Sequence, residues 1–150
     1  MVANDNADLT FTQSGRVAEF IVCADITRRG YYAMHVDAPG FDVLLVRAAK
    51  SFRVQVKSSS TYRSGKLTWR CRTHATSERG NLAKARAVNA NDADIVALYH
   101  HDFDGVIYLP ISQARDRINI PPDRFRLASK IDTIAASIEA PAEWKKVVIG

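Results

Sequence analysis

The stretch from Phe41 to Ser60, FDVLLVRAAKSFRVQVKSSS, constrains the fold more than any other part of this sequence. Its first half, Phe41 to Val46, is apolar except for Asp42, which is typical of a strand buried on both faces. A polar turn from Arg47 to Ser51 follows. The second half alternates, so one face of a strand carries Phe52, Val54 and Val56 and the other carries Arg53, Gln55 and Lys57. The stretch therefore predicts a β-hairpin.

Such a hairpin can bring Asp42 close to Gln55 and Lys57. A carboxylate, an amide oxygen and an ammonium group would then share one patch of the sheet, and this patch is costly to bury without a partner. A metal ion with its anionic ligand would be such a partner, because Mg²⁺ and Ca²⁺ prefer oxygen ligands. The hairpin is therefore a candidate metal site.

These residues resemble the metal site of the PD-(D/E)XK nuclease superfamily. Asp42 and the triplet Gln55-Val56-Lys57 correspond to its motif, with Gln55 where an acid is usual and Pro39 three residues before the acid. The upstream segment from Gly15 to Glu19 resembles the first helix of that fold, and Gly30-Tyr31 resembles its exit. An acid, a Gln-x-Lys triplet and a compact chain together are similar to the small group I intron-encoded homing endonucleases. Archaeal Holliday-junction resolvases share the layout but carry Glu in the triplet.

The resemblance implies a Mg²⁺-dependent endonuclease that hydrolyses DNA phosphodiester bonds. Asp42 would bind Mg²⁺ directly, with the carbonyl of Val56 and the side-chain oxygen of Gln55 as further ligands. Lys57 would orient the attacking water or stabilise the pentacovalent phosphate. Glu19 would be an outer or second metal ligand, and the alternative for Glu19 is an exposed acid favoured by the helix dipole. Because Gln55 is neutral, we expect weaker metal binding than in an Asp/Glu site unless Glu19 contributes.

The charge distribution points to a polyanionic partner. The chain has a net charge of +5 and a pI near 9.4. Between Arg47 and Arg86 there are eleven Arg and Lys residues and one acid, Glu78. A solvated basic face is one interpretation, but clustered cations favour a surface that follows phosphates. We therefore expect double-stranded DNA as the partner.

The segment after the hairpin supplies the candidate DNA contacts. Leu67 to Arg72 reads as a strand after a turn at Arg63 to Lys66, and a two-stranded ribbon of this kind can enter a major groove. Its outward side carries hydroxyls and cations, whereas Trp69 fits the core better than a base-stacking role. The candidate DNA-binding residues are Ser59, Arg63, Lys66, Arg70 and Arg72.

The remaining chain predicts an α/β fold in which helices flank a mixed central sheet of five or six strands, and the resemblance implies that its core is restriction-endonuclease-like. A helix with Ser14 as N-cap runs to about Arg29 and is apolar nearly all round from Val17 to Ile26, which indicates burial. Further expected elements are a strand over 31–36, a weak helix over 81–89, and strands over 94–99 and 106–109. Between the last two, the histidines at 100 and 101 invite a metal-site interpretation, but Asp104-Gly105 indicates a hairpin turn.

The chain is expected to form one domain with a C-terminal addition. We assign residues 1–12 to a disordered leader, 13–120 to the nuclease core, and 121–150 to an extension that packs on the core or joins subunits. No apolar run is long enough to span a bilayer, and the polar N-terminus is not a signal peptide. Cys23 and Cys71 lack metal-ligand spacing, so a reducing cytoplasm is the simplest setting.

Three functions follow from these expectations. The first is a site-specific endonuclease of the homing type, acting as a homo-oligomer (a dimer or tetramer) so that both DNA strands are cut. The second is a junction or repair nuclease that reads DNA shape. The third is a DNA-binding module that has lost catalysis, which is suggested by Gln55 in the position where an acid is usual.

Overall fold

The computed structural model describes residues 9–73 and 85–149 of the 150-residue chain. Its helices and strands follow one another as α1 (Phe11–Arg28), β1 (Tyr32–Ala38), β2 (Phe41–Arg47), β3 (Lys50–Ser59), β4 (Thr61–Arg63), β5 (Lys66–Arg70), β6 (Ile95–His100), β7 (Val106–Pro110), the 3₁₀ helix Ile111–Gln113, β8 (Arg117–Ile120), α2 (Pro122–Ala128), α3 (Thr133–Glu139), the 3₁₀ helix Pro141–Glu143 and the π-helix Lys145–Ile149. No helix within these described ranges is long and apolar enough to cross a membrane.

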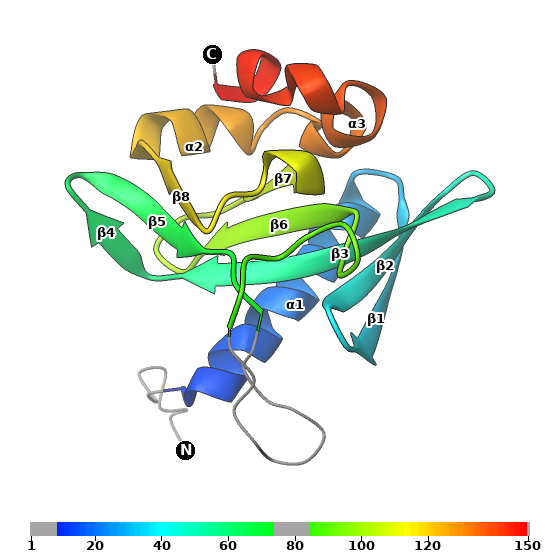
Figure 1. The fold of residues 1–150 in the computed structure, drawn as a ribbon, viewed down its shortest axis with the longest axis horizontal. Helices are drawn as coiled ribbons and strands as arrows, with labels where there is room; N and C mark the ends of the chain where they lie inside the picture. The colour runs from blue at the N-terminus through cyan, green and yellow to red at the C-terminus, as the bar shows by residue number, and fades with distance from the viewer. Residues whose placement is uncertain (1–8, 74–84, 150) are drawn as a thin grey trace, which may run out of the picture.

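The central sheet has five strands in the order β1-β2-β3-β6-β7 (Figure 1). Strands β3 and β6 run parallel, and the other neighbours run antiparallel. Helix α1 crosses one face of the sheet (Figure 1). Helix α2 and the C-terminal π-helix pack in the core on the other face, whereas α3 lies along β7 and its Ile134 packs in the same cluster as α1. This mixed sheet with flanking helices confirms the expected α/β class and its restriction-endonuclease-like core.

The predicted hairpin is formed by β2 and β3. Their pairing runs from Val43↔Val54 to Arg47↔Lys50, and Ala48 in the tight turn has φ +54°. Only one face of β2 is fully buried, because Val43 and Leu45 pack beneath α1 while the alternate residues are partly exposed. The expectation of burial on both faces was therefore wrong for β2, since the described C-terminal elements cover β6 and β7 instead.

Helix α1 begins earlier than expected. Thr10 is its N-cap, and Thr10 and Gln13 exchange hydrogen bonds in a capping box, so Ser14 lies inside the helix. Its buried stripe is Ala18, Val22 and Ile26, at the i, i+4 spacing of one helix face. Phe20, on another face, is 56% exposed, which corrects the expectation that the helix is buried all round.

Strand β6 divides the core into two clusters. Ile95 and Ala97 face α1, whereas Val96 and Leu98 face the opposite side. That opposite side is covered by a smaller sheet with the order β4-β5-β8 and by C-terminal residues including Phe125 and Trp144. Residues 122–149 thus pack on the core. Residues 1–8 of the expected leader lie outside the described residues.

The second predicted helix is absent from its described part. Residues 81–84 of the predicted range are not described, and residues 85–89 are non-helical. Here Ala87 forms a β-bridge with Arg72, and the backbone N–H of Val88 donates to the carbonyl of Cys71 at 3.0 Å. Pairing with the segment after β5 therefore overrides the helix propensity of this Ala-rich stretch.

Candidate functional site

The centre of the site is the point at which the β2–β3 ladder ends. Beyond the Val43↔Val54 pair, Oδ2 of Asp42 accepts hydrogen bonds from the backbone N–H of Val56 at 2.8 Å and from Nε2 of Gln55 at 3.1 Å. Burial raises the pKa of Asp42, the Val56 bond opposes that shift, and the negative charge of Glu19 adds to it. Asp42 therefore lies beside the Gln55–Lys57 triplet as expected, and its carboxylate is poorly solvated.

Lys57 approaches the same site from β3. Its Nζ donates to the backbone carbonyl of Arg72 at 2.6 Å. Burial lowers the pKa of Lys57, while the nearby Cys71 and Asp42 oppose that shift. One of the three ammonium donors is thus fixed by the protein, which aims the group and leaves further donors for an anionic ligand.

Glu19 comes from α1 and is already engaged. Its Oε1 lies 2.8 Å from Nε2 of His35 on β1 and 3.7 Å from a guanidinium nitrogen of Arg16. The Phe20 ring packs on His35 with a centroid distance of 4.9 Å. Glu19 is therefore neither an isolated exposed acid nor an uncommitted ligand. Sequence reasoning missed His35 and Arg16, and only the i, i+3 spacing of Arg16 and Glu19 could have indicated a pair.

These residues line one open cavity of about 700 Å³. It contains most of the residues that the sequence singled out, namely Glu19, Asp42, Gln55, Val56, Lys57, Ser59, Arg63, Arg70 and Arg72. Lys66 is exposed at the β4–β5 turn outside this lining. The cavity also includes Arg117 of β8 and His101 of the β6–β7 link, neither of which was predicted to lie beside Asp42.

Of the predicted DNA contacts, Arg72 and Ser59 have structural partners. Nε of Arg72 lies 2.9 Å from Oδ1 of Asp116 in an ion pair, although it does not have the orientation of a hydrogen bond. Another Arg72 nitrogen donates to the carbonyl of Ala85 at 3.1 Å. The Ser59 hydroxyl donates to the carbonyl of Thr68 and accepts from the N–H of Thr61. The ribbon that carries hydroxyls and cations in the sequence thus meets an acid in the fold, because Asp116, distant in sequence, pairs with Arg72.

The histidine-rich link does not form a metal cluster. His100 is fully buried against Trp69 and Phe103, and Gly105 has the positive φ of +105° expected in a turn. Within the described residues, no group of three or more His, Cys, Asp and Glu side chains is placed to hold a metal ion. Trp69 is likewise a core residue, and its Nε1 donates to the carbonyl of Tyr99 at 2.9 Å.

The donor set around Asp42 nevertheless fits a hard divalent cation. A carboxylate, the amide oxygen of Gln55 and the carbonyl of Val56 are oxygen ligands of the kind that Mg²⁺ and Ca²⁺ accept. The N–H and C=O of one strand residue point the same way, so the carbonyl of Val56 faces the side of β3 on which Asp42 lies. Glu19 could add a second carboxylate from α1. The site therefore suits a weakly held cation completed by water and substrate oxygens.

Comparisons with known proteins agree with this geometry. A model of the PD-(D/E)XK endonuclease family matches residues 10–145. The solved structure of a bacterial homing endonuclease, I-Ssp6803I, superimposes with a TM-score of 0.62 at 18% sequence identity, covering 75% of this chain and 78% of the other. At that identity the likeness concerns the fold. No curated protein sequence matches this chain.

Proposed function

The chain belongs to the PD-(D/E)XK endonuclease family, and from that premise we propose that this nuclease is a Mg²⁺-dependent enzyme that hydrolyses phosphodiester bonds in double-stranded DNA. One observation carries the proposal. Asp42, Gln55, Val56 and Lys57 meet at the end of the β2–β3 ladder, in a cavity whose wall also carries Arg63, Arg70 and Arg117. An acidic and amide cluster beside a cationic wall is suited to a phosphate and its counter-cation.

Asp42, Gln55 and Val56 would hold the cation through their oxygen atoms, with Glu19 as an additional carboxylate. When bound, the cation would neutralise charge that develops on the phosphate during hydrolysis. In the absence of substrate, the two hydrogen bonds to Oδ2 hold the Asp42 carboxylate in place. The acid is thus oriented in advance of binding, which reduces the entropy lost when the site is assembled.

Lys57 would contact the substrate. Its Nζ is held by the carbonyl of Arg72, so its other donors can reach a phosphate oxygen or orient a water. Because burial lowers its pKa, its ammonium group is more readily deprotonated than an exposed lysine. Lys57 can therefore stabilise the pentacovalent phosphate or take part in proton transfer from the attacking water.

Cleavage of both strands at a fixed spacing is simplest with two symmetry-related active sites, so we propose that the enzyme works as a homo-oligomer, either a dimer or a tetramer. Light scattering of the protein with and without DNA measures this directly. A mass corresponding to one chain, at high concentration and on a cognate duplex, would contradict it.

The proposed activity is tested with three DNA substrates. Supercoiled plasmid, linear duplex and a four-way junction are each incubated with the protein in Mg²⁺ and, separately, in EDTA. We expect nicking or cutting of plasmid and duplex in Mg²⁺ alone. Cleavage restricted to the junction would instead favour a junction or repair nuclease. Binding without cleavage of any substrate would favour a non-catalytic DNA-binding module, for which the neutral Gln55 is the specific indication.

A further inference from the structure

The smaller sheet presents a cationic face, which we define as Thr61, Arg63, Lys66, Thr68, Arg70, Arg117 and Asn119. Residues directly opposite each other in a ladder share a face, and alternate residues of one strand do so as well. The register pairs Thr61 with Thr68 and Arg63 with Lys66 across β4–β5. It pairs Thr68 with Asn119 and Arg70 with Arg117 across β5–β8. The other face carries Leu67, Trp69 and Ile120, which are buried in the core.

This cationic face contains no acid, although it holds two like-charged pairs. Arg63 lies opposite Lys66, and Arg70 lies opposite Arg117. Like charges directly opposite in an antiparallel pair destabilise a sheet. The acid nearest to this face in sequence, Asp116 immediately before β8, pairs with Arg72 instead. The two cations of each pair repel each other within the isolated sheet. An anion bound between them would remove that repulsion.

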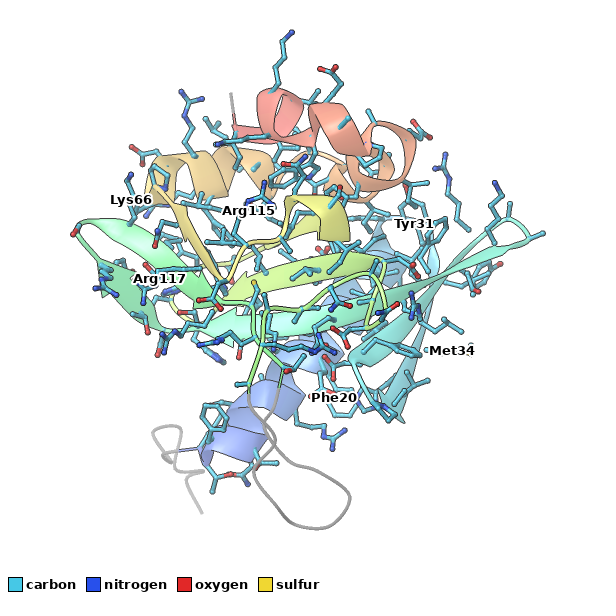
Figure 2. All side chains as sticks on the ribbon, in the orientation of Figure 1. Phe20, Tyr31, Met34, Lys66, Arg115 and Arg117 are labelled. Carbon is cyan, nitrogen blue, oxygen red and sulfur yellow. The ribbon has the colours of Figure 1, made fainter. Side chains whose placement is uncertain are left out.

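The spacing of the two pairs matches a DNA groove. Lys66 and Arg70 are four residues apart on β5, which corresponds to about 13 Å along a strand. The major groove of B-form DNA is about 12 Å wide. Figure 2 shows Lys66 and Arg117 on the smaller sheet, on the side of the molecule away from Phe20 and Met34. A sheet with cations at both rims can therefore contact the two backbones that border the groove.

The middle of the cationic face is neutral and fixed. The Thr68 hydroxyl donates to Oδ1 of Asn119 at 2.8 Å, which joins β5 to β8 at the position between the two pairs. Asn119 is exposed, and with Oδ1 engaged its NH₂ group is the donor that can turn to a ligand. Amide donors of this kind recognise acceptor atoms on base edges in the major groove.

The cationic face is continuous with the active site. Arg63, Thr68, Arg70 and Arg117 line the same cavity as Asp42 and Lys57. Along the chain Arg70 is followed closely by Arg72, whose carbonyl holds Lys57. The Arg70–Arg117 pair is therefore the rim nearer to the proposed site of hydrolysis.

We propose that this face lies across the major groove of the substrate duplex. Arg70 and Arg117 contact the phosphates of the DNA strand that is cut. Arg63 and Lys66 contact the phosphates of the opposite strand, and Asn119 contacts a base edge. This inference rests on the proposed function, because it assumes that the substrate is duplex DNA. It adds β8, which the sequence had not indicated, to the recognition surface and assigns a sequence-reading role to Asn119.

The proposed backbone contacts of the two cation pairs are tested by measuring how salt affects binding to a labelled duplex in EDTA, where no cleavage occurs. The double variant Arg70→Ala/Arg117→Ala should weaken binding to all sequences and reduce the slope of log K against log salt by about two units. A matched control removes the same charge elsewhere, through Arg115→Ala on the loop before β8 and Arg124→Ala on α2. This control should leave the slope unchanged. Arg63→Gln/Lys66→Gln tests the second rim in the same way, and melting temperatures establish that each variant is folded.

The test of base reading is selection of bound duplexes from a random library. Asn119→Ala should change the base preference at one position without changing the salt slope. An unchanged preference would remove Asn119 from base recognition. If the parent cuts DNA while the Arg70→Ala/Arg117→Ala slope equals that of the control, the cationic face is not the contact surface and the proposed nuclease function stands. If the parent neither binds nor cuts DNA, the proposed function itself is wrong.

Discussion

The carboxylate of Asp42 accepts the backbone N–H of Val56 at 2.8 Å, in the place where the β2–β3 ladder would otherwise continue. In the register that pairs Val43 with Val54, the backbone N–H of Val56 would bond to Phe41 as the next hydrogen-bonded pair, but the pairing stops at Val43 and Val54. A side-chain acceptor has thus replaced a main-chain one. The same hydrogen bond satisfies Val56, ends the ladder and orients the acid, which explains why the site lies at the point where these two strands separate.

We predict that Arg72 acts by positioning Lys57 and contributes little to DNA affinity. Its guanidinium is paired with Asp116, and its carbonyl holds the Lys57 ammonium. Arg72→Ala should therefore slow cleavage between about 10- and 100-fold, as expected for a misplaced catalytic group. The salt slope of DNA binding should stay close to that of the parent.

Asp116→Asn distinguishes a positioning role of Arg72 from an effect of the charge of Asp116 on DNA binding. The substitution removes a negative charge near the proposed DNA surface, so a charge effect alone would tighten binding and leave cleavage intact. A positioning role predicts slower cleavage instead, in the same direction as Arg72→Ala. Faster or unchanged cleavage by Asp116→Asn would contradict the positioning role.

Gln55→Glu should make the stability of the protein depend on the metal. The side-chain amide of Gln55 donates a hydrogen bond to Asp42. A glutamate at this position would place a second carboxylate beside Asp42 and remove that donor. We expect a loss of about 1–3 kcal/mol of stability in EDTA, and a larger gain in melting temperature on addition of Mg²⁺ than the parent shows. Gln113→Glu, outside the site, provides the matched control. Equal Mg²⁺ responses of Gln55→Glu and the parent would indicate that Gln55 is not close to the cation.

The raised pKa of Asp42 predicts a specific pH dependence of stability. The folded protein binds this proton more tightly than the unfolded chain, so the parent loses stability as pH rises from the unfolded value of 3.8 through the folded pKa. Asp42→Asn retains an acceptor for Val56 but carries no charge. In metal-free buffer it should be more stable than the parent at about pH 8, and the difference in stability should shrink as pH falls towards 3.8, the pKa of this group in the unfolded chain. Denaturant titrations at several pH values measure this difference, and a constant difference across the range would contradict it.

The hairpin and the positions of four strands could be predicted because local patterns determine them. Apolar runs, strict alternation and turn residues located β2, β3, β6 and β7 to within a few residues. The Ser64–Gly65 turn was also predictable, and both residues have the positive φ that a tight hairpin requires. The approach of Asp42 to the Gln55–Lys57 triplet followed from the pairing alone.

The missed features depend on contacts between distant residues. Arg117 and Asn119 join the site only because β8 pairs with β5. His35 reaches Glu19 only because β1 packs beside α1. Arg72 looked available because no acid is near it in sequence, whereas Asp116 meets it in the fold. The segment after residue 84 looked helical by composition, but its pairing with the residues after β5 prevents a helix.

Cleavage by Asp42→Asn tests the central claim most directly. The parent and Asp42→Asn are compared on the same duplex in Mg²⁺, with DNA affinity measured in parallel in EDTA. We predict that the parent cuts the duplex, that Asp42→Asn loses at least about 100-fold in rate, and that its DNA affinity is retained or increased because a carboxylate near phosphate is repulsive. Cleavage by Asp42→Asn at the rate of the parent would show that Asp42 is not the acid on which hydrolysis depends.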